Sequence, residues 1–104
     1  MSKLIRDKIP QLVFSKEGKS LSVRVASKEE YLILLKQKLV EEANEVLTAS
    51  PASLLQELAD VLEVFAALCK AHGMEDSVFE ARQKKFQERG GFDDRIVLEL
   101  PDAT

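Results

Sequence analysis

Four acidic residues form two pairs whose spacing suits metal binding. Glu42 and Glu45 are three residues apart, and so are Glu57 and Asp60. Residues three or four apart lie on one face of a helix, so each pair would present two carboxylates on the same side. Mg²⁺ prefers hard oxygen ligands and retains positions for water or phosphate oxygens. The two pairs therefore indicate a site for one or more magnesium ions that also receives phosphate.

The acids lie beside apolar stripes, which makes their charge costly. Glu42 falls on the same helical stripe as Leu39 and Val46, and Glu57 and Asp60 border an apolar helix face. Burying several like charges together is unfavourable unless a cation cancels them. The spacing alone also leaves open a simpler interpretation, in which the acids form a solvated helix face.

Two long helices are expected to carry these acids. Ser27 with Glu30 three residues later forms a capping box, which predicts a helix over residues 28–49. The Ser-Pro pair at 50–51 would cap and begin a second helix over residues 51–72. So short a connection predicts that the two helices pack as an antiparallel hairpin.

A third helix and several shorter elements should complete the fold. Gly73 is expected to end the second helix, and residues 75–89 to form the third. A brief helical turn or two is expected within residues 4–14. The alternating residues 21–25 and the mostly apolar residues 96–100 resemble strands that would pair in a small sheet. The predicted fold is mainly α, a helical hairpin plus a third helix, with a small two-stranded sheet.

Composition and length limit the class of protein. The chain has 104 residues, which predicts one domain over residues 1–104. Its 15 basic and 18 acidic residues give a net charge of −3, which does not fit a protein that binds a nucleic acid polymer. The longest apolar stretch, residues 61–69, is interrupted by Glu63 and is too short to span a membrane. A single cysteine, Cys69, and a polar start favour a soluble protein of the reducing cytoplasm.

The acidic pairs belong to a longer pattern. Residues 41–45 (EEANE) followed by residues 57–60 (ELAD) resemble the EExxE…ExxD signature of the MazG-like, all-α nucleoside triphosphate pyrophosphohydrolases. Residues 4–10 (LIRDKIP), and residues 88–92 (ERGGF) with Arg95, resemble a small subgroup of house-cleaning or phosphoribosyl-ATP pyrophosphohydrolase-like proteins. Only 11 residues separate the two acidic motifs, near the short end for this superfamily, so the connecting turn must be tight.

The resemblance implies a reaction, a cofactor and an assembly. The reaction is hydrolysis between the α and β phosphates of a nucleoside triphosphate, giving a nucleoside monophosphate and pyrophosphate. Glu42, Glu45, Glu57 and Asp60 would bind Mg²⁺, with Mn²⁺ as a substitute, and Glu42 or Glu45 would also take a proton from water. Glu41 points about 100° away from Glu42 on a helix and would assist the site or pair with a lysine. The resemblance also implies a bundle completed between the subunits of a homodimer or higher homo-oligomer.

Five basic residues are candidates for binding the substrate phosphates: Lys38, Arg6, Lys8, Arg89 and Arg95. Lys38 lies one turn before Glu42, where it either contacts phosphate or forms an ion pair with Glu42. Arg6 and Lys8 could reach a triphosphate, or else tie the N-terminal segment to the body. Arg89 and Arg95 flank a Gly-Gly-Phe sequence that allows a close backbone approach to a ligand.

Two alternatives to an enzyme remain open from the sequence. In a non-catalytic helical interaction module, the acids would pair with lysines, and Leu34, Leu62 and Phe65 would bind a partner helix. In a nucleotide sensor, metal and nucleotide would bind without turnover. Release of pyrophosphate from a nucleotide separates the enzyme from both alternatives.

Overall fold

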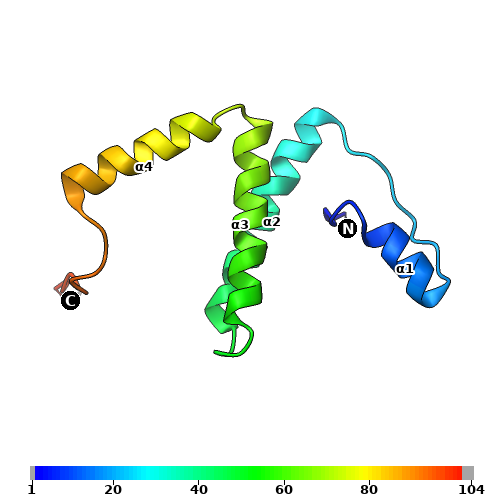
Figure 1. Cartoon of the computed structure of the whole chain (residues 1–104), viewed down its shortest axis with the longest axis horizontal. Helices are drawn as coiled ribbons and strands as arrows, with labels where there is room; N and C mark the ends of the chain where they lie inside the picture. Colours follow the sequence, from blue (N-terminus) through cyan, green and yellow to red (C-terminus); the bar gives the residue numbers. More distant parts are fainter. Residues whose placement is uncertain (1, 102–104) are drawn as a thin grey trace. The chain divides into compact units, whose positions relative to one another are not determined.

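The computed structural model describes residues 2–101, which contain helices but no strand. The helices are α1 (Ile9–Glu17), α2 (Lys28–Thr48), α3 (Leu54–Ala71) and α4 (Glu75–Arg89) (Figure 1). The prediction of a mainly α protein is confirmed. The chain divides into two compact units, one up to residue 73 and the other from residue 74 onwards. That both units form one domain stays a prediction.

The start of α2 follows from its first residues. The Ser27 side chain accepts a hydrogen bond from the backbone N–H of Glu30 at 3.2 Å, which caps the helix as predicted. The reciprocal half of the capping box does not form. The Glu30 carboxylate instead accepts two hydrogen bonds of 2.6 Å from the Arg24 guanidinium. This pair fastens the segment before α2 to the first turn of the helix.

Helix α3 begins at Leu54, three residues later than the sequence predicts. The Ser50 carbonyl accepts hydrogen bonds from the backbone N–H groups of Ser53 and Leu54, at 3.1 and 3.0 Å. These bonds form a turn, and Pro51 lies within it because its fixed φ suits the second position of a turn as well as a helix start. The tight connection between the two acidic motifs is thus the end of α2, a hydrogen-bonded turn over residues 50–54, and the first turn of α3.

Helices α2 and α3 pack against each other and form the predicted hairpin (Figure 1). The buried apolar side chains are Leu35 from α2 and Val64 and Cys69 from α3. Cys69 is a free thiol, as expected for a buried small apolar residue. One acidic side chain, Glu42, is as deeply buried as this core. The hairpin therefore positions a carboxylate inside its own packing surface.

The segment before the hairpin is helical over a longer range than the sequence indicates. Pro10 lies in the first turn of α1, where its missing N–H costs nothing, so it begins the helix rather than breaking it. Gly18 ends α1 with φ +67°, a conformation that favours glycine. Residues 2–8, ahead of α1, form neither helix nor strand. They contact the hairpin through ion pairs described below.

The remaining elements agree with the prediction in part. Gly73 has φ +61° and follows the end of α3, and α4 has the predicted bounds. The segments 21–25 and 96–100 form no strand in the described part of the chain, because a strand needs a backbone partner and neither segment has one within its own unit. Among the described helices, none is long and apolar enough to cross a membrane.

Candidate metal centre and its cleft

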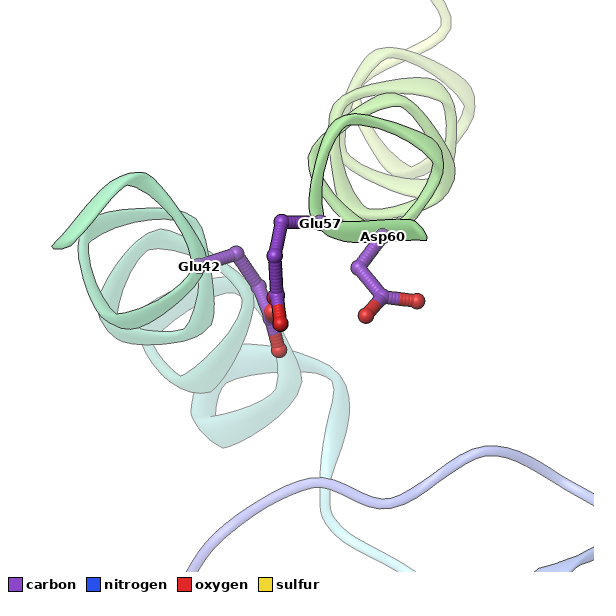
Figure 2. A group of neighbouring side chains, drawn as sticks. All are labelled: Glu42, Glu57 and Asp60. Carbon is purple, nitrogen blue, oxygen red and sulfur yellow. The ribbon is translucent and has the colours of Figure 1, made fainter. Parts of the chain in front are cut away.

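Three carboxylates from the two helices of the hairpin converge. Glu42 comes from α2, and Glu57 and Asp60 come from successive turns of α3. One oxygen from each residue lies within 4.8 Å of the others (Figure 2). The i, i+3 spacing of Glu57 and Asp60 places both on the face of α3 that meets α2. The structure thus brings together three of the four acids that the sequence singles out.

Two oxygens of this group are buried without a hydrogen-bond donor. Glu42 is only 6% exposed, and neither its Oε2 atom nor Oε2 of Glu57 has a hydrogen-bond partner among the described residues. Leaving a buried acceptor unsatisfied costs about 1–3 kcal/mol, and more for a charged group. A divalent cation between the carboxylates would satisfy both atoms. The residues present therefore fit a hard metal ion such as Mg²⁺.

The fourth acid, Glu45, lies outside the group of three but acts on Glu42. The pKa of Glu42 is raised above its ordinary value, first by burial and then by the neighbouring Glu45 carboxyl, while Lys38 opposes the shift. Both raising effects disfavour the ionised form. The raised pKa and the unpartnered oxygens both follow from the burial of the Glu42 carboxylate beside other acids.

Basic side chains already border the carboxylates. The Lys38 ammonium lies 3.5 Å from Glu42 Oε1 and 4.0 Å from Glu41. The Arg6 guanidinium donates to Oδ1 of Asp60 at 2.7 Å. Each cation pairs with one of the three clustered acids, but neither reaches the orphaned oxygens of Glu42 and Glu57. Both interpretations of Lys38 and Arg6 from the sequence, ion pairing and phosphate binding, remain compatible with these positions.

A cleft of about 810 Å³ opens beside Glu42 and Asp60. Basic residues line part of it: Lys3, Arg6, Lys8 and Lys38. Apolar and aromatic residues line another part, among them Tyr31, Leu35, Val64 and Ala67, and two further acids, Asp7 and Glu63, also belong to the lining. A volume of this size falls in the range of small-molecule sites. The cleft joins an acidic cluster, a group of cations and an apolar wall, which together suit a nucleotide with its metal.

Tyr31 and Lys3 also line the cleft, although neither was among the candidate site residues. Tyr31 could have been found, because it precedes Leu35, Lys38 and Glu42 by four, seven and eleven residues and so lies on the same face of α2. Lys3 offers no such pattern. Its ammonium lies 3.5 Å from Glu41, a contact between residues far apart in the sequence.

Arg89 and Arg95 lie in the second unit, around a small pocket of about 200 Å³ formed by residues 89–96. Gly90 has φ +78° and Arg95 has φ +57°, so the chain turns sharply there. Phe92 is 96% exposed in this loop, where a core residue would be covered. That these two arginines bind the substrate stays a prediction.

A comparison with protein families identifies the chain. The model of the phosphoribosyl-ATP pyrophosphohydrolases matches residues 6–88, a stretch that includes the three clustered acids and Arg6. No curated protein and no solved structure matches the chain. Members of this family are hydrolases that act on phosphoanhydride bonds and typically depend on a metal. The chain therefore belongs to the phosphoribosyl-ATP pyrophosphohydrolase family of the MazG-like, all-α nucleoside triphosphate pyrophosphohydrolases, and it is an enzyme of that class.

Proposed function

We propose that this protein is a Mg²⁺-dependent nucleoside triphosphate pyrophosphohydrolase that removes non-standard nucleotides. It would cleave between the α and β phosphates to give a nucleoside monophosphate and pyrophosphate. The observation that carries the proposal is the buried Glu42 carboxylate, which clusters with Glu57 and Asp60 and has an oxygen with no hydrogen-bond partner among the described residues. The family match supports the phosphoanhydride chemistry.

The acidic residues divide into two roles in this proposal. Glu42, Glu57 and Asp60 would hold the ion, because their oxygens already converge. When bound, Mg²⁺ supplies charge neutralisation at the phosphates and an acidified water. Glu45 lies beside Glu42 but outside the convergent group, so its carboxylate would take the proton that the attacking water loses. Glu42 is the second choice for this proton.

The direction of the nucleotide follows from the order of residues along α2. Glu42, Lys38 and Tyr31 all line the cleft, and at a rise of 1.5 Å per residue Tyr31 lies about 16.5 Å from Glu42 and about 10.5 Å from Lys38 along the helix. The phosphates would lie at the Lys38 end, with Arg6 and Lys8 as further contacts. The base would lie against Tyr31 and Leu35, because an aromatic ring and an aliphatic side chain provide an apolar surface for it.

A panel of nucleotides tests the proposal. Phosphoribosyl-ATP, the standard triphosphates and oxidised or deaminated triphosphates are each incubated with the protein and Mg²⁺, and both products are measured. We expect pyrophosphate and monophosphate in equal amounts, with the highest kcat/KM for a non-standard nucleotide. As a control, Glu80→Gln should give the same products and rates as the wild type, since Glu80 is an exposed residue of α4. Release of inorganic phosphate and a nucleoside diphosphate, in place of pyrophosphate and a monophosphate, would contradict the proposed cleavage site.

The exposed apolar residues of the hairpin support a homodimer. On α3 they recur at alternating spacings of three and four, the pattern of helices that pack in bundles: Leu55, Leu58, Leu62 and Phe65. On α2, Val40 and Leu47 are exposed seven residues apart. We propose that a second copy of the chain covers these stripes, because exposed apolar patches of this extent mark interaction surfaces.

Leu62→Glu should dissociate the homodimer without unfolding the hairpin. Leu62 is 65% exposed, so the substitution does not disturb the core of its own chain. Burying a leucine contributes about 1.5–3 kcal/mol, and a symmetric interface would lose two of them. Sedimentation velocity and helical content by circular dichroism provide the measurements. Val25→Glu is the control, since Val25 is 97% exposed and lies outside both stripes. Unchanged association of Leu62→Glu would mean that another surface forms the dimer.

A further inference from the structure

One of the three clustered acids already has a close cationic partner from a distant part of the chain. The Arg6 guanidinium donates to Asp60 at 2.7 Å, across a separation of 54 residues. The ammonium of Lys38 lies further from its acid, at 3.5 Å from Glu42. Arg6 belongs to the short irregular segment ahead of α1, whereas Lys38 is fixed on α2. Of these two cations, Arg6 is therefore the one on a segment that helical structure does not hold.

The Asp60 carboxylate cannot bind a divalent ion and keep its full ion pair with Arg6 at the same time. A metal ion on the carboxylate withdraws its negative charge and repels a neighbouring guanidinium. The existing pair is only moderately shielded from water, with 56% of the Arg6 side chain and 41% of the Asp60 side chain exposed. Pairs this exposed contribute little stability, so the exchange of one cation for another requires little energy.

A second anion lies within the reach of Arg6 once a nucleotide occupies the cleft. Arg6 lines the cleft together with Lys3, Lys8 and Lys38. A guanidinium binds phosphate oxygens through two parallel hydrogen bonds, as it does a carboxylate. The segment that carries Arg6 is also held by apolar contacts, since Leu4 and Ile9, on either side of Arg6, are half-buried and line the cleft. The loss of the Asp60 contact would therefore free Arg6 without releasing the whole segment.

We propose that Arg6 is a counter-ion of Asp60 that a divalent ion replaces during the reaction cycle. It pairs with Asp60 before a divalent ion binds, gives up that carboxylate to the ion, and then binds a phosphate of the substrate. Arg6 thus competes with the metal and cooperates with the nucleotide. The inference rests on the proposed function, since it assumes that Asp60 is a metal ligand and that the substrate is a phosphoanhydride.

Arg6→Gln should change metal and substrate binding in opposite directions. Mg²⁺ affinity without nucleotide, measured by isothermal titration calorimetry, should rise about two- to fivefold because a competing exposed ion pair is lost. The KM for the triphosphate should rise about tenfold or more, because a hydrogen bond to a charged phosphate is lost. Arg6→Lys keeps the charge without the planar fork, so its Mg²⁺ affinity should stay near that of the wild type while KM still rises.

Lys3→Gln is the matched control for the metal titration. It removes one positive charge from the same segment but leaves Asp60 paired, so its Mg²⁺ affinity should not change. An increase equal to that of Arg6→Gln would overturn the inference in favour of a general charge effect. So would an Arg6→Gln protein with unchanged or weaker Mg²⁺ binding, or with an unchanged KM. A wild-type protein that binds no Mg²⁺ would instead contradict the proposed function itself.

Discussion

Replacing Glu57 with glutamine should lower kcat/KM by about 100-fold or more, since loss of a group that merely supports a metal ligand already costs 10- to 100-fold. Glutamine is nearly isosteric with glutamate but carries no charge to hold the ion. The variant should be as stable as the wild type or slightly more so in the absence of metal. Its amide can donate a hydrogen bond within a group where two carboxylate oxygens have no partner.

Two measurements on the Glu57→Gln variant separate a metal ligand from a structural residue. Pyrophosphate release gives the activity, and urea unfolding in EDTA gives the free energy of unfolding. Glu80→Gln changes the same functional group at an exposed position of α4 and should leave both quantities unchanged. Activity of Glu57→Gln within a few fold of the wild type would contradict the assignment of Glu57 as a ligand.

Magnesium should stabilise the folded protein strongly. A ligand that binds only the folded state at about 100 times its Kd adds about 2.7 kcal/mol to the free energy of unfolding. For a domain of this size that energy corresponds to a rise in Tm of about 10–20 °C. Thermal melts in EDTA and in millimolar MgCl₂, at matched ionic strength, provide the measurement. A melting curve that does not move would argue against the carboxylate cluster as a metal site.

The stabilisation by Mg²⁺ should grow as the pH rises. The pKa of Glu42 is raised by burial and by Glu45, so the metal-free fold favours the protonated carboxyl and loses that advantage as the pH rises through the raised pKa. The ion binds the ionised carboxylate, so protons compete with it at low pH. The difference in Tm with and without Mg²⁺ should therefore shrink on acidification. Glu42→Gln should show little difference in Tm at any pH.

The sequence predicted the elements that depend on local chemistry. Ser27 caps α2 and Gly73 follows α3 with a positive φ, because both act through their own backbone neighbours. The convergence of Glu42 with Glu57 and Asp60 followed from helical spacing and a short connection. These interactions join residues that are close in sequence or that lie on two adjacent helices, and for such residues the helical periodicity predicts which side chains meet.

Contacts between distant segments could not be predicted in the same way. Nothing in the spacing of residues 3–8 indicates that Arg6 meets Asp60 or that Lys3 meets Glu41. The segments 21–25 and 96–100 have the alternating or apolar composition of strands, but that composition does not supply a pairing partner. The predicted start of α3 at residue 51 is wrong, because a proline fits a turn as well as the first position of a helix.

The position of Tyr31 has a practical consequence for studying this protein. The chain contains one tyrosine and no tryptophan, and that tyrosine lines the cleft beside Leu35 and Lys38. The intrinsic ultraviolet fluorescence of the protein therefore arises almost entirely from the cleft. A base stacking on the phenol ring would quench this emission, whereas an ion bound near Glu42 would act on it only at a distance. If the base lies against Tyr31 as proposed, this emission would distinguish binding of a nucleotide from binding of a metal ion without an attached dye.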